Sequence, residues 1–276
     1  MRILFWNTRR LANSALIAKL AHEHQTDVLI LAEPGAKLAE ILTELNEGQE
    51  VQFVPDPSPG LSDRLQLFYR YRSESIRLVR DEVDVAVRHL NPPAQATLLL
   101  VAAHLPSKLY ITAEDQVLAA PPLARMIEAA EDLVGHRRTI VIGDLNMNPF
   151  EAGVVGAGGL HAVMDRRIAL RMERILRDER YRFFYNPMWT TMGDREGSPP
   201  GTYFYPAGGA VSYYWNTFDQ VLVRPDLLHG LEPQRDIQII TKANGTELIR
   251  GRFGRPDKRI SDHLPILLNL ALPETS

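Results

Sequence analysis

Short apolar segments that end in a carboxylate, an amide or a histidine constrain the fold of this chain most. Residues 139–142 lead into Gly143-Asp144-Leu145-Asn146, and Ser261-Asp262-His263 comes just before the apolar residues 264–268. Four or five apolar residues in a row are typical of a buried β-strand. The pattern therefore predicts polar side chains on rigid strand ends, which suits a divalent-metal hydrolase of phosphate esters.

Strands and helices are expected along most of the chain. Helical spacing of apolar residues predicts helices at 11–24, 36–45 and 112–134. Further strands are expected at residues 2–6, 28–32, 65–69, 83–87, 97–101, 218–223, 237–241 and 266–270. The strands between 51 and 103 follow one another without a helix, which implies antiparallel pairing. No repeat or linker divides the chain, so we expect one domain over residues 1–276, an α/β fold with two mixed sheets packed face to face.

Composition excludes several classes of protein. The chain has no cysteine, which rules out disulfides and thiolate zinc sites. Its net charge of −3 gives no global sign of nucleic-acid binding, although a local basic surface would suffice. The N-terminus does not have the pattern of a signal peptide, and no apolar run approaches the length of a membrane span. A cytoplasmic protein with no membrane partner is the default expectation.

Glu33 ends the expected strand 28–32, and Asp144 and Asn146 follow the strand 139–142. Glu33 could hold Mg²⁺, since hard cations choose oxygen ligands, or be a solvated glutamate before a turn. Asp144 and Asn146 point the same way on an extended segment, so that one could accept a proton while the other orients a phosphate. A turn leading into Asn148 explains the same residues without chemistry.

His263 directly follows Asp262. Its imidazole could transfer a proton or donate a hydrogen bond to a phosphoryl oxygen, while Asp262 faces a metal. Asp219 places a charge inside an apolar strand, where a buried carboxylate needs a partner, and His263 is the partner we expect. The alternatives are a turn with Asp262 and His263 in water and an Asp219 that faces outward.

Asn7 and His104 also end strands. Asn7 could hold a metal-bound water or a phosphate oxygen, or serve only in a turn. His104 could be a second acid–base histidine, although histidines at strand ends are often structural. Lys108, shortly after it, could contact phosphate.

This chain resembles the endonuclease/exonuclease/phosphatase superfamily in an ordered set of motifs that spans nearly the whole length of the chain. They are Trp6-Asn7, Glu33, His104, Gly143-Asp144-Leu145-Asn146, Phe218-Asp219-Gln220 and Ser261-Asp262-His263. Members of the superfamily include pancreatic deoxyribonuclease, abasic-site endonucleases, neutral sphingomyelinases and inositol-polyphosphate phosphatases. The resemblance implies a four-layer α-β-β-α sandwich of two mixed sheets flanked by helices, with the site at one end of both sheets.

By this resemblance, Glu33 is a ligand of Mg²⁺, or of Mn²⁺ in its place, with Asp262 or Asn7 contributing. Some members carry an acidic residue two places after the first asparagine, and this chain has Arg9 there. A second metal ligand at this position is therefore in doubt.

The resemblance also implies that Asp144 activates or positions the attacking water, that Asn146 orients the phosphate and that Asp219 holds His263. His104 is similar to the histidine of the deoxyribonuclease-like and sphingomyelinase-like branches, where the abasic-site branch tends to carry a tyrosine. The candidate carboxylate partners of His104 are Asp63, Glu74 and Asp84.

Two arginine-rich stretches bear on the substrate. Residues 164–182 hold seven arginines against four acids, with apolar residues at helical spacing. We expect a helix there, which could lie along a phosphate backbone or be solvated and carry ion pairs. Residues 250–259 form a basic loop that leads into Asp262 and His263 and favours a polyanionic substrate, with Arg255, Lys258 and Arg259 as its contacts.

Twelve of the 21 aromatic residues lie between Tyr181 and Phe218, where they could stack on the bases of a single strand, although core packing explains most of them. The leading hypothesis is a magnesium-dependent nuclease acting on DNA or RNA. The alternative is a phosphatase or phosphodiesterase acting on a small or lipid phosphate ester such as an inositol phosphate. The lack of an evident exposed apolar hairpin weighs against a lipid. A binding module with a vestigial site conflicts with the intact polar set.

Overall fold

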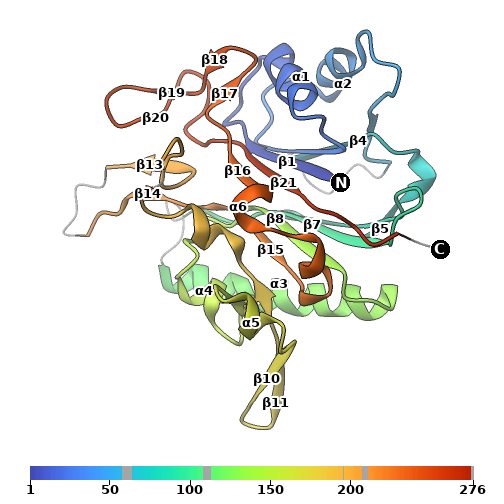
Figure 1. The fold of residues 1–276 in the computed structure, drawn as a ribbon, viewed down its shortest axis with the longest axis vertical. Helices are drawn as coiled ribbons and strands as arrows, with labels where there is room; N and C mark the ends of the chain where they lie inside the picture. Colours follow the sequence, from blue (N-terminus) through green and yellow to red (C-terminus); the bar gives the residue numbers. More distant parts are fainter. Residues whose placement is uncertain (58–63, 108–112, 195, 207–210, 275–276) are drawn as a thin grey trace.

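The computed structural model describes residues 1–57, 64–107, 113–194, 196–206 and 211–274. Two mixed sheets pack face to face, and helices cover their outer surfaces (Figure 1), which confirms the predicted sandwich. The helices are α1 (Ser14–Glu23), α2 (Leu38–Asn46), α3 (Ala113–Val134), α4 (Ala152–Val155), α5 (Arg166–Ala169) and α6 (Pro233–Asp236). The helices α1 and α2 lie above the first sheet and α3 lies below the second in this view.

The first sheet is mixed because β1 and β2 run parallel while its other neighbours are antiparallel. Its spatial order is β16 (Ile237–Ile239), β21 (Ile266–Asn269), β1 (Arg2–Asn7), β2 (Val28–Ala32), β4 (Leu65–Tyr69) and β3 (Val54–Pro55).

In the second sheet, β7–β8 and β12–β9 are parallel and the other pairs are antiparallel. Its spatial order is β5 (Ile76–Glu82), β6 (Val85–Leu90), β7 (Leu98–His104), β8 (Thr139–Asp144), β15 (Asp219–Val223), β12 (Phe184–Tyr185) and β9 (Ala162–Val163). The expected antiparallel pairing of consecutive strands before residue 103 is confirmed for β6 and β7, whereas β4 pairs in the first sheet and β5, which pairs with β6, was not predicted.

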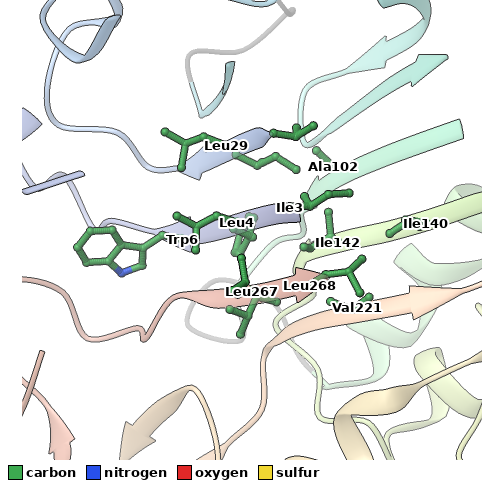
Figure 2. Packing of buried hydrophobic residues seen from close by; sticks show 14 of the residues in the cluster. Ile3, Leu4, Trp6, Leu29, Ala102, Ile140, Ile142, Val221, Leu267 and Leu268 are labelled. Carbon is green, nitrogen blue, oxygen red and sulfur yellow. The ribbon is translucent and has the colours of Figure 1, made fainter. Parts of the chain in front are cut away.

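Two-residue alternation along β7 divides the core. Leu99 and Val101 pack in one cluster with Ile127 of α3, whereas Leu100 and Ala102 belong to the cluster between the sheets. Figure 2 shows side chains of β1 meeting those of β7, β8 and β15 in that inner cluster. Side chains alternate between the two faces of a strand. The residue two positions beyond the last inward-facing apolar residue therefore also faces inward.

Small two-stranded sheets extend from this frame. They are β10 (Glu173–Leu176) with β11 (Glu179–Arg182), β13 (Tyr203–Tyr205) with β14 (Tyr214–Asn216), β17 (Lys242–Ala243) with β18 (Thr246–Glu247), and β19 (Ile249–Arg250) with β20 (Arg255–Pro256). Within the described residues, no helix combines the length and the apolar character that a membrane span requires.

The prediction of a helix over residues 164–182 is wrong. Only α5 is helical there, and the rest forms the β10–β11 hairpin, which projects from the body of the molecule (Figure 1). Arg177 and Asp178 turn the chain with φ of 51° and 64°. The side chain of Ile175 is 66% exposed and that of Leu176 is also exposed, although the hairpin as a whole is mostly charged. The strand expected at 83–87 begins later, at Val85, because the chain turns at residues 83 and 84.

Candidate active site

Three titratable side chains form one row across the second sheet. Asp144, at the end of β8, is the register partner of His104 on β7 and of Asp219 on β15. Each continues the inner face of its strand, two residues beyond an apolar neighbour such as Ile142 or Ala102. All three are buried, with exposures of 2%, 1% and 0% for His104, Asp144 and Asp219.

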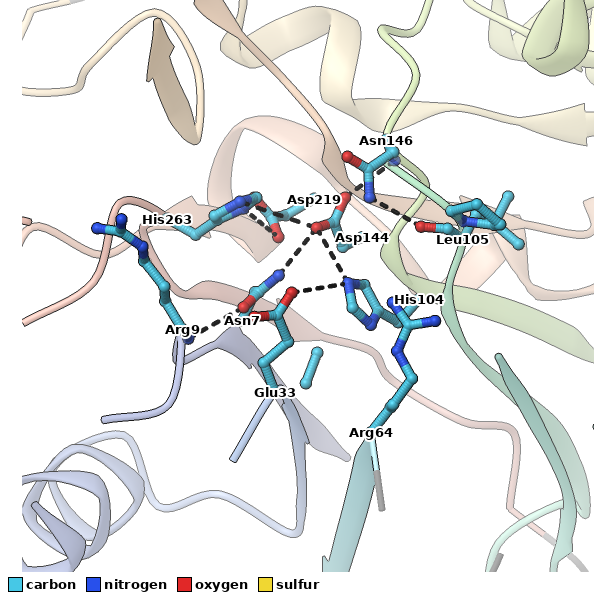
Figure 3. Close-up of polar contacts among 12 residues, drawn as sticks. Asn7, Arg9, Glu33, Arg64, His104, Leu105, Asp144, Asn146, Asp219 and His263 are labelled. Carbon is cyan, nitrogen blue, oxygen red and sulfur yellow. Dashed lines mark hydrogen bonds and ion pairs between the residues drawn. The ribbon is translucent and has the colours of Figure 1, made fainter. Parts of the chain in front are cut away.

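The first sheet supplies two side chains that face this row. Asn7 ends β1, and its Nδ2 donates a hydrogen bond to Asp144 Oδ2 at 3.0 Å. Glu33 follows β2 with φ of 45°, an uncommon conformation for glutamate that turns the chain at the sheet edge. Its Oε1 lies 3.3 Å from Nε2 of His104. The site therefore lies where the ends of both sheets meet, as Figure 3 shows.

The expected hydrogen bond between His263 and Asp219 is present. Nδ1 of His263 lies 2.8 Å from Asp219 Oδ2 and 3.1 Å from Oδ1, so that Nε2 points toward Asp144 Oδ2 at 3.8 Å. The His263 backbone is held as well, because its carbonyl accepts from the Trp6 indole and its N–H donates to Ser261 Oγ. This loop has little freedom to change the direction of the imidazole.

Buried charges set the protonation of the His263 side. Burial by itself lowers the pKa of His263, but the negative charges of Asp219 and Asp144 and the hydrogen bond that His263 donates to Asp219 outweigh it and raise that pKa to about 10. The imidazole is therefore a cation at neutral pH. Burial raises the pKa of Asp144 above its usual value, and the positive charge of His263 opposes the rise. Asp144 is thus a stronger base than an exposed aspartate.

The carboxylate that approaches His104 is Glu33, which differs from the three sequence candidates. Asp84 pairs with Arg64, Glu74 lies exposed in the short helix Ser73–Ser75, and Asp63 is outside the described residues. The hydrogen bond from His104 lowers the pKa of Glu33, although burial opposes this. Among the described residues, His104 Nδ1 has no hydrogen-bond partner.

Asp262 sits beside a cation. Its Oδ2 is 3.3 Å from Nε of Arg9, and the two side chains are 14% and 48% exposed. The backbone N–H of Arg9 donates to Asn7 Oδ1 at 3.1 Å. Arg9 thus occupies the position where an acid would have added a metal ligand, and it neutralises Asp262 from the solvent side.

Asn146 turns the chain just after the row, with φ of 51°. Its backbone N–H donates to Asp144 Oδ1 at 2.9 Å, and its Nδ2 donates to the carbonyl of Leu105 at 2.8 Å. Gly143 permits the close strand contact beside them, since a Cβ there would lie 1.9 Å from the Ala103 carbonyl oxygen. The side-chain amide of Asn146 therefore also ties β8 to the end of β7.

The two arginine-rich stretches lie in different places. Arg255, Lys258 and Arg259 line a pocket of about 490 Å³ that also includes Asp262, so this stretch borders the site. The hairpin β10–β11 projects elsewhere (Figure 1). Lys108 lies outside the described residues.

Two contacts of the site had no signal of their own in the sequence. The ring of Tyr203 lies 4.7 Å from that of His263, and the aromatic-rich composition around Tyr203 did not single it out. The pairing of Glu33 with His104 joins two different sheets. Neither residue's local sequence indicates the other.

Among the described residues, one group of donor atoms is close enough to share a metal ion, with atoms of Asp144, Asp219 and His263 within 4.8 Å of one another. A cation bound by His263 at this place would have to displace a proton from the imidazole, which is cationic at neutral pH. Glu33, Asn7 and Asp262 instead offer oxygen atoms from the first sheet and the loop before β21, which is the chemistry that Mg²⁺ prefers.

Comparison with known proteins agrees with this geometry. A sequence model described as Endonuclease/Exonuclease/phosphatase family matches residues 4–263. A family protein from Leptotrichia buccalis shares the fold with a TM-score of 0.58 at 11% identity, covering 99% of this chain and 100% of its own.

Two further structures have the same fold. A 3′-5′ exonuclease from Neisseria meningitidis has a TM-score of 0.54 at 15% identity, with 98% of this chain and 99% of its own covered. The endonuclease domain of TRAS1, a telomere-specific retrotransposon, has a TM-score of 0.52 at 15% identity, with 98% of each chain covered. The search of curated proteins finds no match.

Proposed function

The chain belongs to the endonuclease/exonuclease/phosphatase family, a family of phosphoric ester hydrolases, and on this premise we propose that it is a magnesium-dependent nuclease acting on DNA or RNA. One observation carries the proposal. A buried carboxylate, Asp144, lies between two imidazoles and an amide at the joint end of two sheets. A phosphodiester needs a base for the attacking water and positive charge for its oxygens, and this row supplies both.

Glu33 is the proposed metal ligand, with Asn7 or Asp262 contributing. The Glu33 side chain is 36% exposed at the edge of the sheet, so that a cation can reach it. Mg²⁺, or Mn²⁺ in its place, would neutralise phosphate charge and polarise the reacting bond there. Because Arg9 already lies against Asp262, we propose a single metal ion.

Asp144 is the proposed general base. Its raised pKa makes it a better proton acceptor, while the hydrogen bond from Asn7 holds one carboxylate oxygen in place. His263 is cationic and directed by Asp219, so Nε2 can donate to a phosphoryl oxygen as negative charge builds up on it. His104 would act from the opposite side, and Asn146 would help to orient the phosphate.

Nucleic acid is the proposed substrate for two reasons. The proteins of the same fold described as a 3′-5′ exonuclease and as the endonuclease domain of a telomere-specific retrotransposon cleave nucleic acids. In this chain, Arg255, Lys258 and Arg259 border the site, and cations beside a nuclease site bind the phosphates that flank the cleaved one.

The test is a substrate and metal panel. Plasmid DNA, single-stranded and duplex oligonucleotides, RNA and inositol phosphates are incubated with the protein in Mg²⁺, Mn²⁺ or chelator, beside an Asp144→Asn control. We expect cleavage of nucleic acid that needs the metal and is lost in the control. Intact DNA and RNA under every metal condition would refute the nuclease.

A second candidate, a phosphodiesterase acting on lipid phosphate esters, is favoured by the hairpin β10–β11. Ile175 and Leu176 are exposed near its tip, among several arginines, and such a surface suits an anionic lipid layer. Release of a phosphorylated headgroup from vesicles, with DNA and RNA left intact, would select this function.

A further inference from the structure

A pocket beside the candidate site joins cationic and apolar walls. It has a volume of about 490 Å³ and reaches the site at Asp262. Four of its lining side chains are cations, against the carboxylates of Asp257 and Asp262. The cations are Arg250, Arg255, Lys258 and Arg259.

The cations of the pocket are not equivalent. Asp257 is buried and pairs with both Arg259 and Arg250, so these two guanidinium groups are already neutralised in part. Within the part of the chain that the structure describes, Arg255 and Lys258 are in no ion pair, and both are exposed. They are therefore the two charges free to receive an anion.

The other wall is apolar. Phe204, Pro206 and Pro256 line it, and β13 lies beside β20 (Figure 1), which brings this wall against the basic loop. An anion with no apolar part, such as an inositol polyphosphate, would leave these side chains unused. A nucleotide has both a charged and an apolar part, and a volume in this range is typical of a small-ligand site.

Two aromatic rings, on the face of β13 opposite to Phe204, form a row that leads to the site. Tyr205, which is 47% exposed, stacks with Tyr203 at a centroid distance of 6.4 Å and an interplanar angle of 18°. Tyr203 in turn lies 4.7 Å from His263. Exposed aromatic rings of this kind bind nucleobases that are not already stacked.

Resting on the nuclease function proposed above, we infer that the substrate is single-stranded, and that Arg255 and Lys258 bind the phosphate of an unpaired nucleotide next to the cleaved bond. A base inside a duplex has both faces stacked and its edge paired, so it can neither enter a pocket of about 490 Å³ nor stack on Tyr205 without leaving the helix. The structure thus narrows the substrate from nucleic acid to unpaired strands or frayed ends.

The experiment compares the wild type, the double variant Arg255→Ala/Lys258→Ala and a matched control. The control, Arg171→Ala/Arg174→Ala, removes the same number of positive charges, one just before the β10–β11 hairpin and one in it. Three substrates are used: a labelled single-stranded oligonucleotide, the same sequence in a duplex, and the p-nitrophenyl ester of thymidine 5′-monophosphate, which has only the phosphate to be cleaved. Binding of the single strand in chelator is measured by fluorescence anisotropy over a range of salt.

We expect the wild type to prefer the single strand to the duplex. The pocket variant should lose about 10- to 100-fold in kcat/KM on the single strand, as expected for two charged contacts. Its fold loss on the small ester should be at least ten times smaller. Its slope of log affinity against log salt should become shallower by about 0.7, which corresponds to one neutralised phosphate on a single strand. The control should retain wild-type values.

Equal cleavage of duplex and single strand, or equal losses on the oligonucleotide and the small ester, would overturn the inference while leaving the nuclease in place. The inference would also be overturned if an inositol polyphosphate, but not oligothymidylate, displaced the labelled single strand at low concentration, because the pocket would then select that ligand. Failure of the proposed function is a different result, since neither the oligonucleotides nor the small ester would then be hydrolysed.

Discussion

Two histidine–carboxylate pairs flank Asp144, and they differ in the burial of the carboxylate. His104 and His263 each place Nε2 3.8 Å from the same oxygen of Asp144, and both imidazoles are buried. The partner of His263 is Asp219, fully buried at 2.8 Å, whereas the partner of His104 is Glu33, at 3.3 Å with 36% of its side chain exposed.

The difference follows from burial. Asp219 cannot be solvated by water, so its charge is balanced by His263 and the two hold each other in one protonation state. Glu33 is in reach of water and of cations, so its contact with His104 can be exchanged. We therefore regard His263 as a fixed positive charge and His104 as the side of the site that responds to the metal.

Removing the two imidazoles should separate these roles most clearly. His263→Ala is expected to lower kcat/KM on an oligonucleotide by about 10³- to 10⁴-fold, and His104→Ala by about 10²-fold, because the cation of His263 is held by the buried Asp219 and faces the phosphate. Steady-state kinetics measures both losses, with circular dichroism as the folding control. A larger loss for His104→Ala would reverse the assignment.

Removing the charge of Asp219 should have a smaller effect than removing His263. Asp219→Asn is expected to lower kcat by about 10²-fold and to bring the pKa of His263 down from about 10, because the imidazolium loses its nearest negative charge. Activity would then fall as pH rises through the new, lower value. NMR titration of the imidazole follows the pKa directly, and Glu33→Gln is the matched control. An unchanged pKa in Asp219→Asn would contradict the pairing as its cause.

Binding of a metal ion should change the surroundings of His104 but not those of His263. Titration with Mg²⁺ is expected to shift the NMR signals of His104, since the cation draws Glu33 away from it, and to leave those of His263 nearly unchanged. Chelator should restore the original spectrum. If the signals of His263 moved instead, the ion would be bound by the group Asp144, Asp219 and His263.

Stability against pH should show the smallest difference. The folded pKa of His263 is raised from 6.5 to about 10, so its contribution is complete below pH 6.5 and is lost as pH rises through about 10. The pKa of Glu33 is lowered from 4.5, so its contribution is present above pH 4.5 and is lost as pH falls further. Because Glu33 is 36% exposed, solvent screening makes that contribution small.

Thermal unfolding from pH 3 to pH 10 measures both slopes. The decline of Tm between pH 7 and pH 10 should be steeper in the wild type than in His263→Gln. Glu33→Gln should differ from the wild type only slightly, on the acid side. Parallel alkaline slopes in the wild type and His263→Gln would show that His263 is not charged in the folded protein.

Local patterns predicted most strands of the two large sheets, but they missed β5 and gave the wrong structure for one segment. The strands β2 and β4 have the predicted bounds, because apolar runs and turn residues act over a few positions. Residues 164–182 have apolar side chains at helical spacing, yet they form a hairpin with its tip at Arg177 and Asp178. That turn has positive φ at both residues and contains no glycine or asparagine, the usual signal for it.

The amino-acid sequence by itself determined which residues end strands and which carry charge, since both follow from local composition and a two-residue period. Only the tertiary structure decided that Asp144 has His104 and Asp219 as its register neighbours and that Glu33 meets His104 across two sheets. Register and sheet packing depend on contacts between residues far apart in the chain, so no local pattern encodes them. Adjacency in the sequence placed residues 250–259 beside Asp262 and His263, whereas only the fold could show that the β10–β11 hairpin projects elsewhere.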